Sequence, residues 1–65
     1  MYRFSIIDEH FVIDSITNIR YVLDKKQYEE MCELKDRFNQ DVYLSKLLIT
    51  GSLIQYNATF WNNRL

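Results

Sequence analysis

The C-terminal third of the chain, residues 42–61, most constrains what this sequence can fold into. No acidic residue follows Asp41, and one helical stripe contains Leu44, Leu47, Leu48, Gly51, Ala58 and Trp61. The remaining apolar residues of this stretch are spread around the rest of the circumference, and a helix of that kind is buried on several sides. A chain of 65 residues buries only about 60% of its unfolded surface. We therefore expect a second copy or a partner to cover part of this helix.

Residues 42–63 fit three arrangements: one helix, two helices or a hairpin. The runs 47–50 and 53–56 flank Gly51 and Ser52, a pair typical of a type II′ hairpin turn. A break within the helix at residues 50–52 is the second alternative, because glycine is unfavourable in a helix interior. The length of the apolar stripe favours the helix.

The first third of the chain predicts a three-stranded antiparallel meander. Apolar residues alternate with polar ones over residues 2–6, and β-type residues recur at 11–13 and 19–23. Residues 14–18 predict the hairpin loop between the second and third strands. In that loop we expect Asp14 to accept backbone hydrogen bonds and Asn18 to take the left-handed conformation.

The apolar residues of this meander divide between two faces. One face is expected to hold Val12, Tyr21 and Leu23, and the other Phe11, Ile13 and Val22. An antiparallel sheet with one solvated face normally alternates more cleanly. The second face is therefore predicted to be covered as well, by the C-terminal segment or by another chain.

A helix is predicted to start after Asp24, which forms a capping box with Gln27, and to run over residues 25–38. Residues 39–41 predict a break, with Asp41 as the N-cap of a second helix. The lone cysteine, Cys32, lies beside Met31 on the first helix and is expected in the core. The expected fold is one α+β domain over residues 1–65, with the three-stranded antiparallel meander packed on one or two C-terminal α-helices.

Neither a disulfide nor a metal is expected to stabilise this small core. One cysteine forms no internal disulfide, and Cys32 with His10 falls short of a structural zinc site. The lone cysteine also favours an intracellular location, in the cytoplasm. The stretch 42–61 holds too many polar groups for a typical membrane span, so no membrane association is expected.

No enzymatic activity is predicted, and we assign no catalytic, cofactor-binding or metal-binding residue. Asp8, Glu9 and His10 form the one cluster of potential acid–base groups, and they fall in a predicted turn where such residues are usually solvated. The sequence has no phosphate-binding loop, dinucleotide fingerprint or HExxH motif.

Binding surfaces are the remaining candidates. The predicted partner or homodimer interface consists of Tyr43, Leu44, Leu47, Leu48, Tyr56, Phe60 and Trp61, because large aromatic residues concentrate binding energy. A possible acidic contact face consists of Glu29, Glu30, Glu33 and Asp36. The alternative is a regulator that contacts nucleic acid phosphates through Lys25, Lys26 and Lys46. The net charge of −1 argues against this alternative.

Residues 14–24 (DSITNIRYVLD) followed by 28–34 (YEEMCEL) carry a family resemblance. This layout resembles small uncharacterised proteins of phages and prophages, which often have a hairpin with a D-x-x-T-[GN] turn and then a helix of the type D-x-x-Q/E-Y-x-E-L-C-x-L. Asn18 stands where glycine is commoner, and Met31 where leucine is commoner. The resemblance covers about a third of the chain. It implies an accessory protein that binds and sterically inhibits or regulates a host protein, such as a defence nuclease or a transcription or replication factor, in the host cytoplasm.

Overall fold

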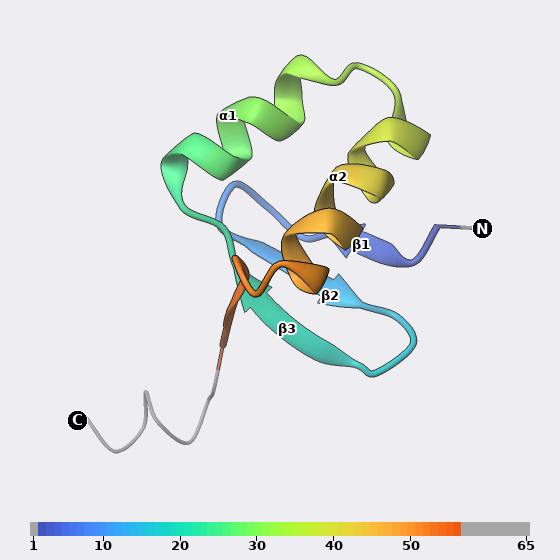
Figure 1. Ribbon diagram of the computed structural model, residues 1–65, viewed down its shortest axis with the longest axis vertical. Helices are drawn as coiled ribbons and strands as arrows, with labels where there is room; N and C mark the ends of the chain where they lie inside the picture. The colour runs from blue at the N-terminus through green and yellow to red at the C-terminus, as the bar shows by residue number, and fades with distance from the viewer. Residues whose placement is uncertain (1, 57–65) are drawn as a thin grey trace.

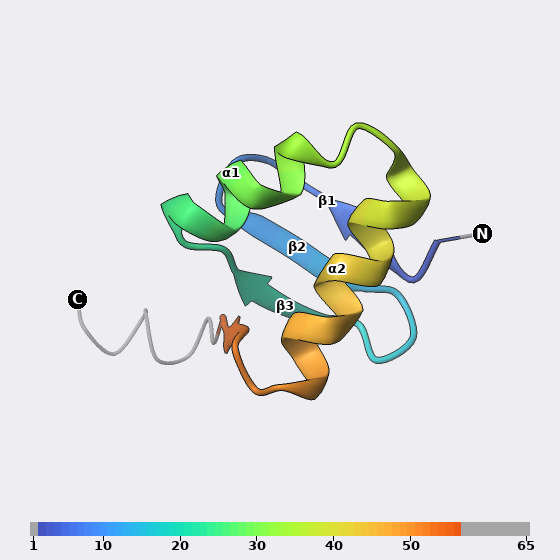
Figure 2. The same cartoon turned by 45° about the horizontal axis from the view of Figure 1, so that its top comes forward.

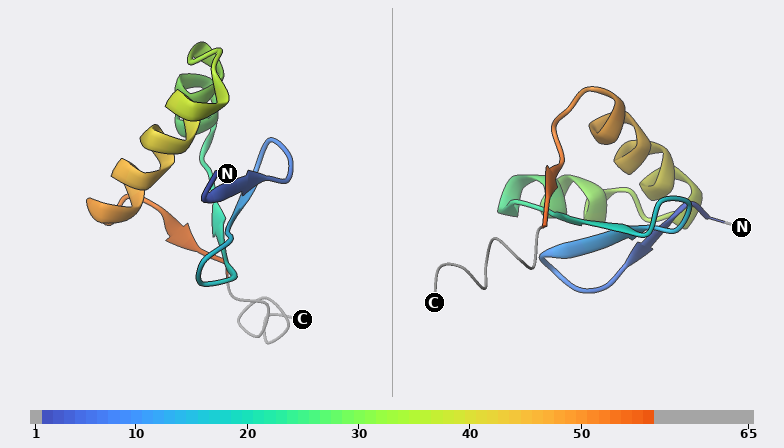
Figure 3. Two further views of the ribbon diagram at one scale, coloured as in Figure 1. Left: turned by 90° about the vertical axis from the view of Figure 1, so that its right-hand side faces the viewer. Right: turned by 90° about the horizontal axis from the view of Figure 1, so that it is seen from below.

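The computed structural model describes residues 2–56 and has an α+β architecture. Its elements, in chain order, are β1 (Phe4–Ile6), β2 (Phe11–Asp14), β3 (Ile19–Val22), α1 (Lys25–Glu33), α2 (Arg37–Ile49) and β4 (Ile54–Gln55). The strands form one antiparallel sheet in the order β1-β2-β3-β4, and both helices pack on the same face of it (Figures 1 and 3). The predicted fold class and meander are confirmed, with β4 as an additional strand.

The hairpin between β2 and β3 forms as its residue types predict. The Asp14 carboxylate accepts a hydrogen bond from the backbone N–H of Ile16 at 2.9 Å. Asn18 has a φ of 62°, in the left-handed region that asparagine tolerates. These local features set the β2–β3 register, in which Val12 lies opposite Tyr21.

The core lies between the sheet and the two helices. Its buried apolar residues are Phe4, Val12, Tyr21, Leu23, Met31 and Leu44. Val12, Tyr21 and Leu23 therefore share the buried face, as predicted. Met31 on α1 and Leu44 on α2 are the fully buried residues of the helices, and partly buried neighbours such as Tyr28 and Leu47 pack around them.

The first helix is correctly capped but shorter than predicted. Asp24 and Gln27 form both bonds of the capping box. The helix ends at Glu33, and Asp36 caps α2 by accepting from the N–H of Asn39. The break predicted at residues 39–41 and the cap at Asp41 are therefore wrong. Gln40 explains part of the difference, since its side chain donates to the carbonyls of Met31 and Leu34 and holds the corner between the helices.

The second helix ends at Ile49, so the helix predicted to continue to residue 61 is wrong over residues 50–56, and its last part, residues 57–61, lies outside the described residues. Gly51 has a φ of 73°. Its N–H donates to the carbonyl of Leu48, and the N–H of Ser52 donates to that of Leu47. This pair of bonds is a Schellman motif, which ends helices at a left-handed glycine. The chain then turns back and adds β4 to the edge of β3.

Asp41 has a role that its N-cap interpretation missed. Its carboxylate accepts from the backbone N–H groups of Phe4 at 2.7 Å and Arg3 at 3.2 Å. From the same helix, Arg37 Nη2 donates to the carbonyl of Phe4 at 2.8 Å. Two side chains of α2 thus occupy the outer edge of β1, where the start of the helix lies over the start of the strand (Figure 2).

Candidate interaction surface

Both helices lie on one side of the sheet, so its other face points away from them (Figure 3). We call it the open face, and by the strand register it holds Ser5, Ile7, Phe11, Ile13, Arg20, Val22, Ile54 and Tyr56. Phe11 lies opposite Val22, which in turn lies opposite Ile54. Within residues 2–56, no helix or strand covers this face.

An aromatic pair joins distant strands across the open face. The rings of Phe11 on β2 and Tyr56 after β4 meet edge to face, with centroids 5.4 Å apart. With Ile7 and Arg20 they line a shallow pocket of about 150 Å³. Ile7 and Ile54 at the margins are 49% and 68% exposed. The open face therefore combines apolar area with a concave centre.

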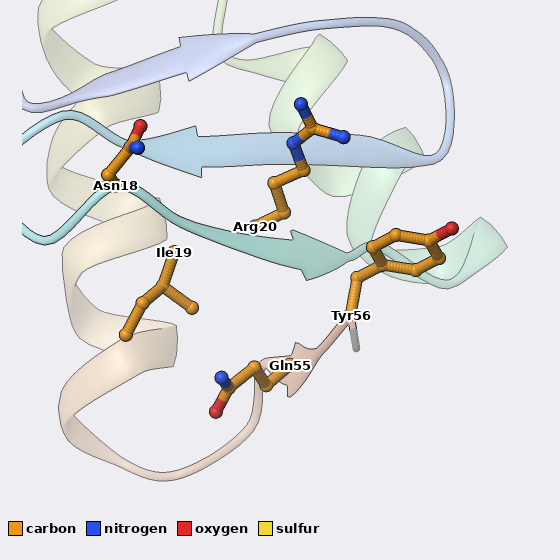
Figure 4. Close-up of a pocket in the computed structure, with 5 residues that line it drawn as sticks. All are labelled: Asn18, Ile19, Arg20, Gln55 and Tyr56. Atoms are coloured by element: carbon orange, nitrogen blue, oxygen red, sulfur yellow. The ribbon is translucent and has the colours of Figure 1, made fainter. Parts of the chain in front are cut away.

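A second hollow, of about 350 Å³, lies where β3 and β4 meet. It is lined by Asn18, Ile19, Arg20, Gln55 and Tyr56. In Figure 4 the Arg20 side chain extends across β3 toward β2, while Ile19 points the opposite way. Arg20 and Tyr56 line both hollows, so the two hollows adjoin on the open face. Among the described residues, no carboxylate forms an ion pair with it.

The sheet's other face carries an ion pair between the buried carboxylate of Asp14 and the partly exposed guanidinium of Arg3. Asp14 is fully buried and accepts from Arg3 Nε at 3.1 Å and Nη2 at 2.8 Å. The hydrogen bonds from Arg3, followed by the backbone N–H of Ile16, lower the pKa of Asp14 despite its burial. This pair lies on the helix side of the sheet and leaves the open face uncharged except for Arg20.

This pair predicts a loss of stability in acid. Because the folded pKa of Asp14 lies below its ordinary value of 3.8, the carboxylate stabilises the fold at pH values above 3.8. That stabilisation is lost as the pH falls through the lowered folded pKa. Urea unfolding across a pH series should show this loss, and the Asp14→Asn variant should lack that component. Equal pH dependence in both proteins would contradict the assignment.

The predicted interface residues are divided by the structure. Leu44 is 0% exposed, so it belongs to the chain's own core and offers no surface to a partner. Tyr43, Leu47 and Leu48 pack against that core from α2. Tyr56 is the one predicted interface residue on the open face, and Phe60 and Trp61 lie outside the described residues. The sequence signal for the open face was the second apolar face of the meander, formed by Phe11, Ile13 and Val22.

The predicted acidic residues are all exposed, and two of them have structural partners. Asp36 caps α2, and Glu30 accepts from the hydroxyl of Tyr43 at 2.6 Å. Burial and then this hydrogen bond raise the pKa of Tyr43. Glu29 and Glu33 lie exposed on α1. The acids of the described helices thus serve partly to hold the fold together.

The remaining candidates do not form a reactive site within the described part of the chain. Cys32 is exposed, so its predicted place in the core is wrong. Asp8 accepts from the N–H groups of His10 and Phe11 and orders the turn between β1 and β2. In residues 2–56, no three His, Cys, Asp or Glu side chains are grouped to hold a metal ion. In the same range, no helix is both long and apolar enough to cross a membrane.

The lysines of the nucleic-acid alternative are exposed on the helices. Lys25 and Lys26 begin α1, and Lys46 lies in the last turn of α2. α2 also carries an outward apolar row of Phe38, Val42 and Ile49, at 62%, 37% and 82% exposure. Ser45 and Lys46 interrupt this row, whereas on the open face apolar residues lie side by side on β2, β3 and β4.

Comparison with known proteins gives no family model, no curated protein and no solved structure that matches this chain.

Proposed function

We propose that this chain is a small non-enzymatic interaction protein that binds another protein through the open face and acts by steric occlusion. The observation that carries this proposal is the continuous apolar surface of the sheet, with Phe11 and Tyr56 at its centre. Apolar patches of this kind on a small domain mark interaction sites.

The composition of the open face supports a protein as the partner. Aromatic residues and arginine are enriched in protein interfaces, while acids and lysine are depleted. The open face has two aromatic residues, one arginine, and no acid or lysine. The complementary surface is therefore an apolar patch with a carboxylate placed to meet Arg20. Nucleic acid is a poorer match for this face, because a single guanidinium can neutralise few phosphates of a nucleic-acid backbone.

The resemblance to phage accessory proteins makes a host cytoplasmic protein the proposed target, with inhibition or regulation as the outcome. Steric inhibition needs no chemistry from the bound protein. It needs only an interface that excludes what the target normally binds. A homodimer through the open face is the competing arrangement, and the sedimentation profile of the purified protein distinguishes it.

The test compares two matched variants as bait. Phe11→Ser removes an aromatic ring from the open face, and Phe38→Ser removes the same ring from the exposed side of α2. A protein captured from a bacterial host lysate by the wild type and by Phe38→Ser should be identified by mass spectrometry and then purified. We expect Phe11→Ser to weaken its binding by at least about tenfold, the effect of truncating a central interface aromatic.

Two further results decide the proposal. Binding through an apolar interface should change little between low and moderate salt, whereas contacts to phosphate would weaken steeply. If the captured protein binds Phe11→Ser as tightly as wild type, or is lost only with Phe38→Ser, the open face is not the binding surface.

A further inference from the structure

The two hollows of the open face differ in what lines them, and Arg20 belongs to both. The smaller is lined otherwise by aliphatic and aromatic side chains, whereas the larger includes the side-chain amides of Asn18 and Gln55. We propose that the open face binds an extended segment of a partner protein in which a large apolar residue and an Asp or Glu stand two positions apart. The apolar side chain enters the smaller hollow, and the carboxylate meets Arg20. This inference rests on the proposed function, because it names the partner chemistry that the open face recognises.

The smaller hollow sets the size of the apolar group. Its volume is about 150 Å³, and its walls include Ile7 and the edge-to-face pair of Phe11 and Tyr56. An apolar cavity of about this volume holds a benzene-sized group. One aromatic or large aliphatic side chain of the partner is therefore enough to fill it.

The charge of Arg20 sets the second group. Arg20 is exposed, and within residues 2–56 no carboxylate forms an ion pair with it. A segment that fills the smaller hollow also covers this guanidinium, and covering a charge without an acceptor costs free energy. A carboxylate matches the fork of an arginine and can accept two hydrogen bonds from it. A second copy of the chain would present another Arg20 and no acid from its own open face, so the charge favours a different protein.

The strand register sets the spacing between the two groups. Phe11 lies opposite Val22, and Ile13 lies opposite Arg20, so Phe11 and Arg20 are diagonal neighbours. Diagonal neighbours on one face of a sheet lie about 7–8 Å apart. The Arg20 side chain also extends toward β2, the strand of Phe11 (Figure 4). In an extended segment, residues two positions apart lie on the same side at about 6.6 Å, whereas adjacent residues point to opposite sides. A spacing of two positions therefore fits both contacts at once.

The test is an NMR titration of the isotope-labelled full-length protein with short capped peptides. The segment has two possible directions across the face, so the probes are Ser-Phe-Thr-Glu-Ser and its reverse, Ser-Glu-Thr-Phe-Ser. We expect one of them to shift the amide signals of Phe11, Arg20 and Tyr56 to saturation. Replacing Glu by Gln in that peptide should weaken binding about fivefold, the upper range for an ion pair that stays partly hydrated. A peptide in which Phe and Glu are adjacent should bind no better than the Gln form.

Two protein variants with the same change of charge locate the effect. In Arg20→Gln the Glu and Gln peptides should bind equally, because the guanidinium that distinguishes them is gone. Lys35→Gln removes an exposed charge between α1 and α2 and should preserve the fivefold difference. Circular dichroism checks that both variants are folded. The comparison of the Glu and Gln peptides on the wild type needs no variant, so it remains decisive if Arg20→Gln is unfolded.

Three results would overturn the inference: no saturable shift with either peptide, equal binding of the Glu and Gln forms by the wild type, or a fivefold difference that persists in Arg20→Gln. Each is separate from the failure of the proposed function. If Phe11→Ser still loses the captured protein, the open face remains the binding surface and only the acidic motif is wrong. If Phe11→Ser retains the captured protein, the proposed function itself fails.

Discussion

Leu44→Ala is expected to lower the free energy of unfolding by about 2–5 kcal/mol. Leu44 is the one fully buried residue of α2 and lies in the core between the sheet and the helices. Its truncation removes apolar contacts and leaves a cavity that the small core cannot fill by collapse. Stability in proteins is roughly 0.1 kcal/mol per residue, so a loss of this size leaves the domain close to unfolded at room temperature. Urea denaturation followed by far-ultraviolet circular dichroism measures it.

Ile49→Ala on the same helix is the matched control. Ile49 is 82% exposed, so the substitution removes apolar atoms without creating a cavity, and the urea midpoint should stay close to that of the wild type. The pair of variants distinguishes the two apolar sides of α2. A large loss with Ile49→Ala and a small one with Leu44→Ala would mean that the helix packs with its opposite side on the sheet.

Features decided by neighbours in sequence were predictable. The capping box of Asp24 and Gln27 and the left-handed Asn18 each depend on residues no more than four apart. The two faces of the meander are set by strand alternation, which places Val12 and Tyr21 inside. In these cases the local preference and the tertiary structure agree, as expected for a chain that folds to one state.

Features decided across the fold were not predictable from the pattern. Asp36 and Asp41 are both residue types that commonly cap helices. Asp36 caps α2, whereas Asp41 accepts from a backbone N–H at the start of β1, a contact between distant residues that the sequence pattern does not reveal. α2 has two apolar sides, one through Leu44 and one through Phe38 and Ile49, so periodicity indicated an all-round apolar helix. Gly51 also fitted a hairpin turn, but the bonds from its own N–H to Leu48 and from the N–H of Ser52 to Leu47 make it the end of α2.

The candidate site was predicted only in part, for a related reason. The sequence predicted excess apolar surface in two places, the stripe of Leu44, Leu47 and Leu48 and the second face of the meander, and the interface was assigned mainly to the stripe. That stripe is used internally, because α2 stops at Ile49 and lies against the sheet. The surplus instead lies on the opposite side of the sheet, where Phe11 and Val22 have no described element to pack against. Which of its two apolar surfaces this chain buries therefore depends on where α2 ends.

Asp41→Ala is expected to lower the free energy of unfolding by about 2 kcal/mol and to promote association. The substitution removes the acceptor for the backbone N–H groups of Arg3 and Phe4. Those groups lie on the outer edge of β1, and an unpaired strand edge is a template for another strand. Asp41 therefore both fastens α2 to the sheet and blocks pairing of β1 with a second molecule. Urea denaturation measures the first effect, and sedimentation velocity over a concentration series measures the second.

Asp41→Asn removes the charge of Asp41 but keeps a hydrogen-bond acceptor, so it distinguishes loss of the hydrogen bonds to β1 from loss of charge. The amide retains one oxygen, which still accepts from the N–H of Phe4, the shorter of the two bonds at 2.7 Å. Its loss of stability should therefore be smaller than that of Asp41→Ala, and it should stay monomeric at concentrations where the alanine variant associates. If the two variants lose equal stability and neither associates, the carboxylate acts through its charge and the edge of β1 is protected by Arg37 and the helix itself. If only the alanine variant associates, the edge of β1 is kept closed by a single side-chain oxygen.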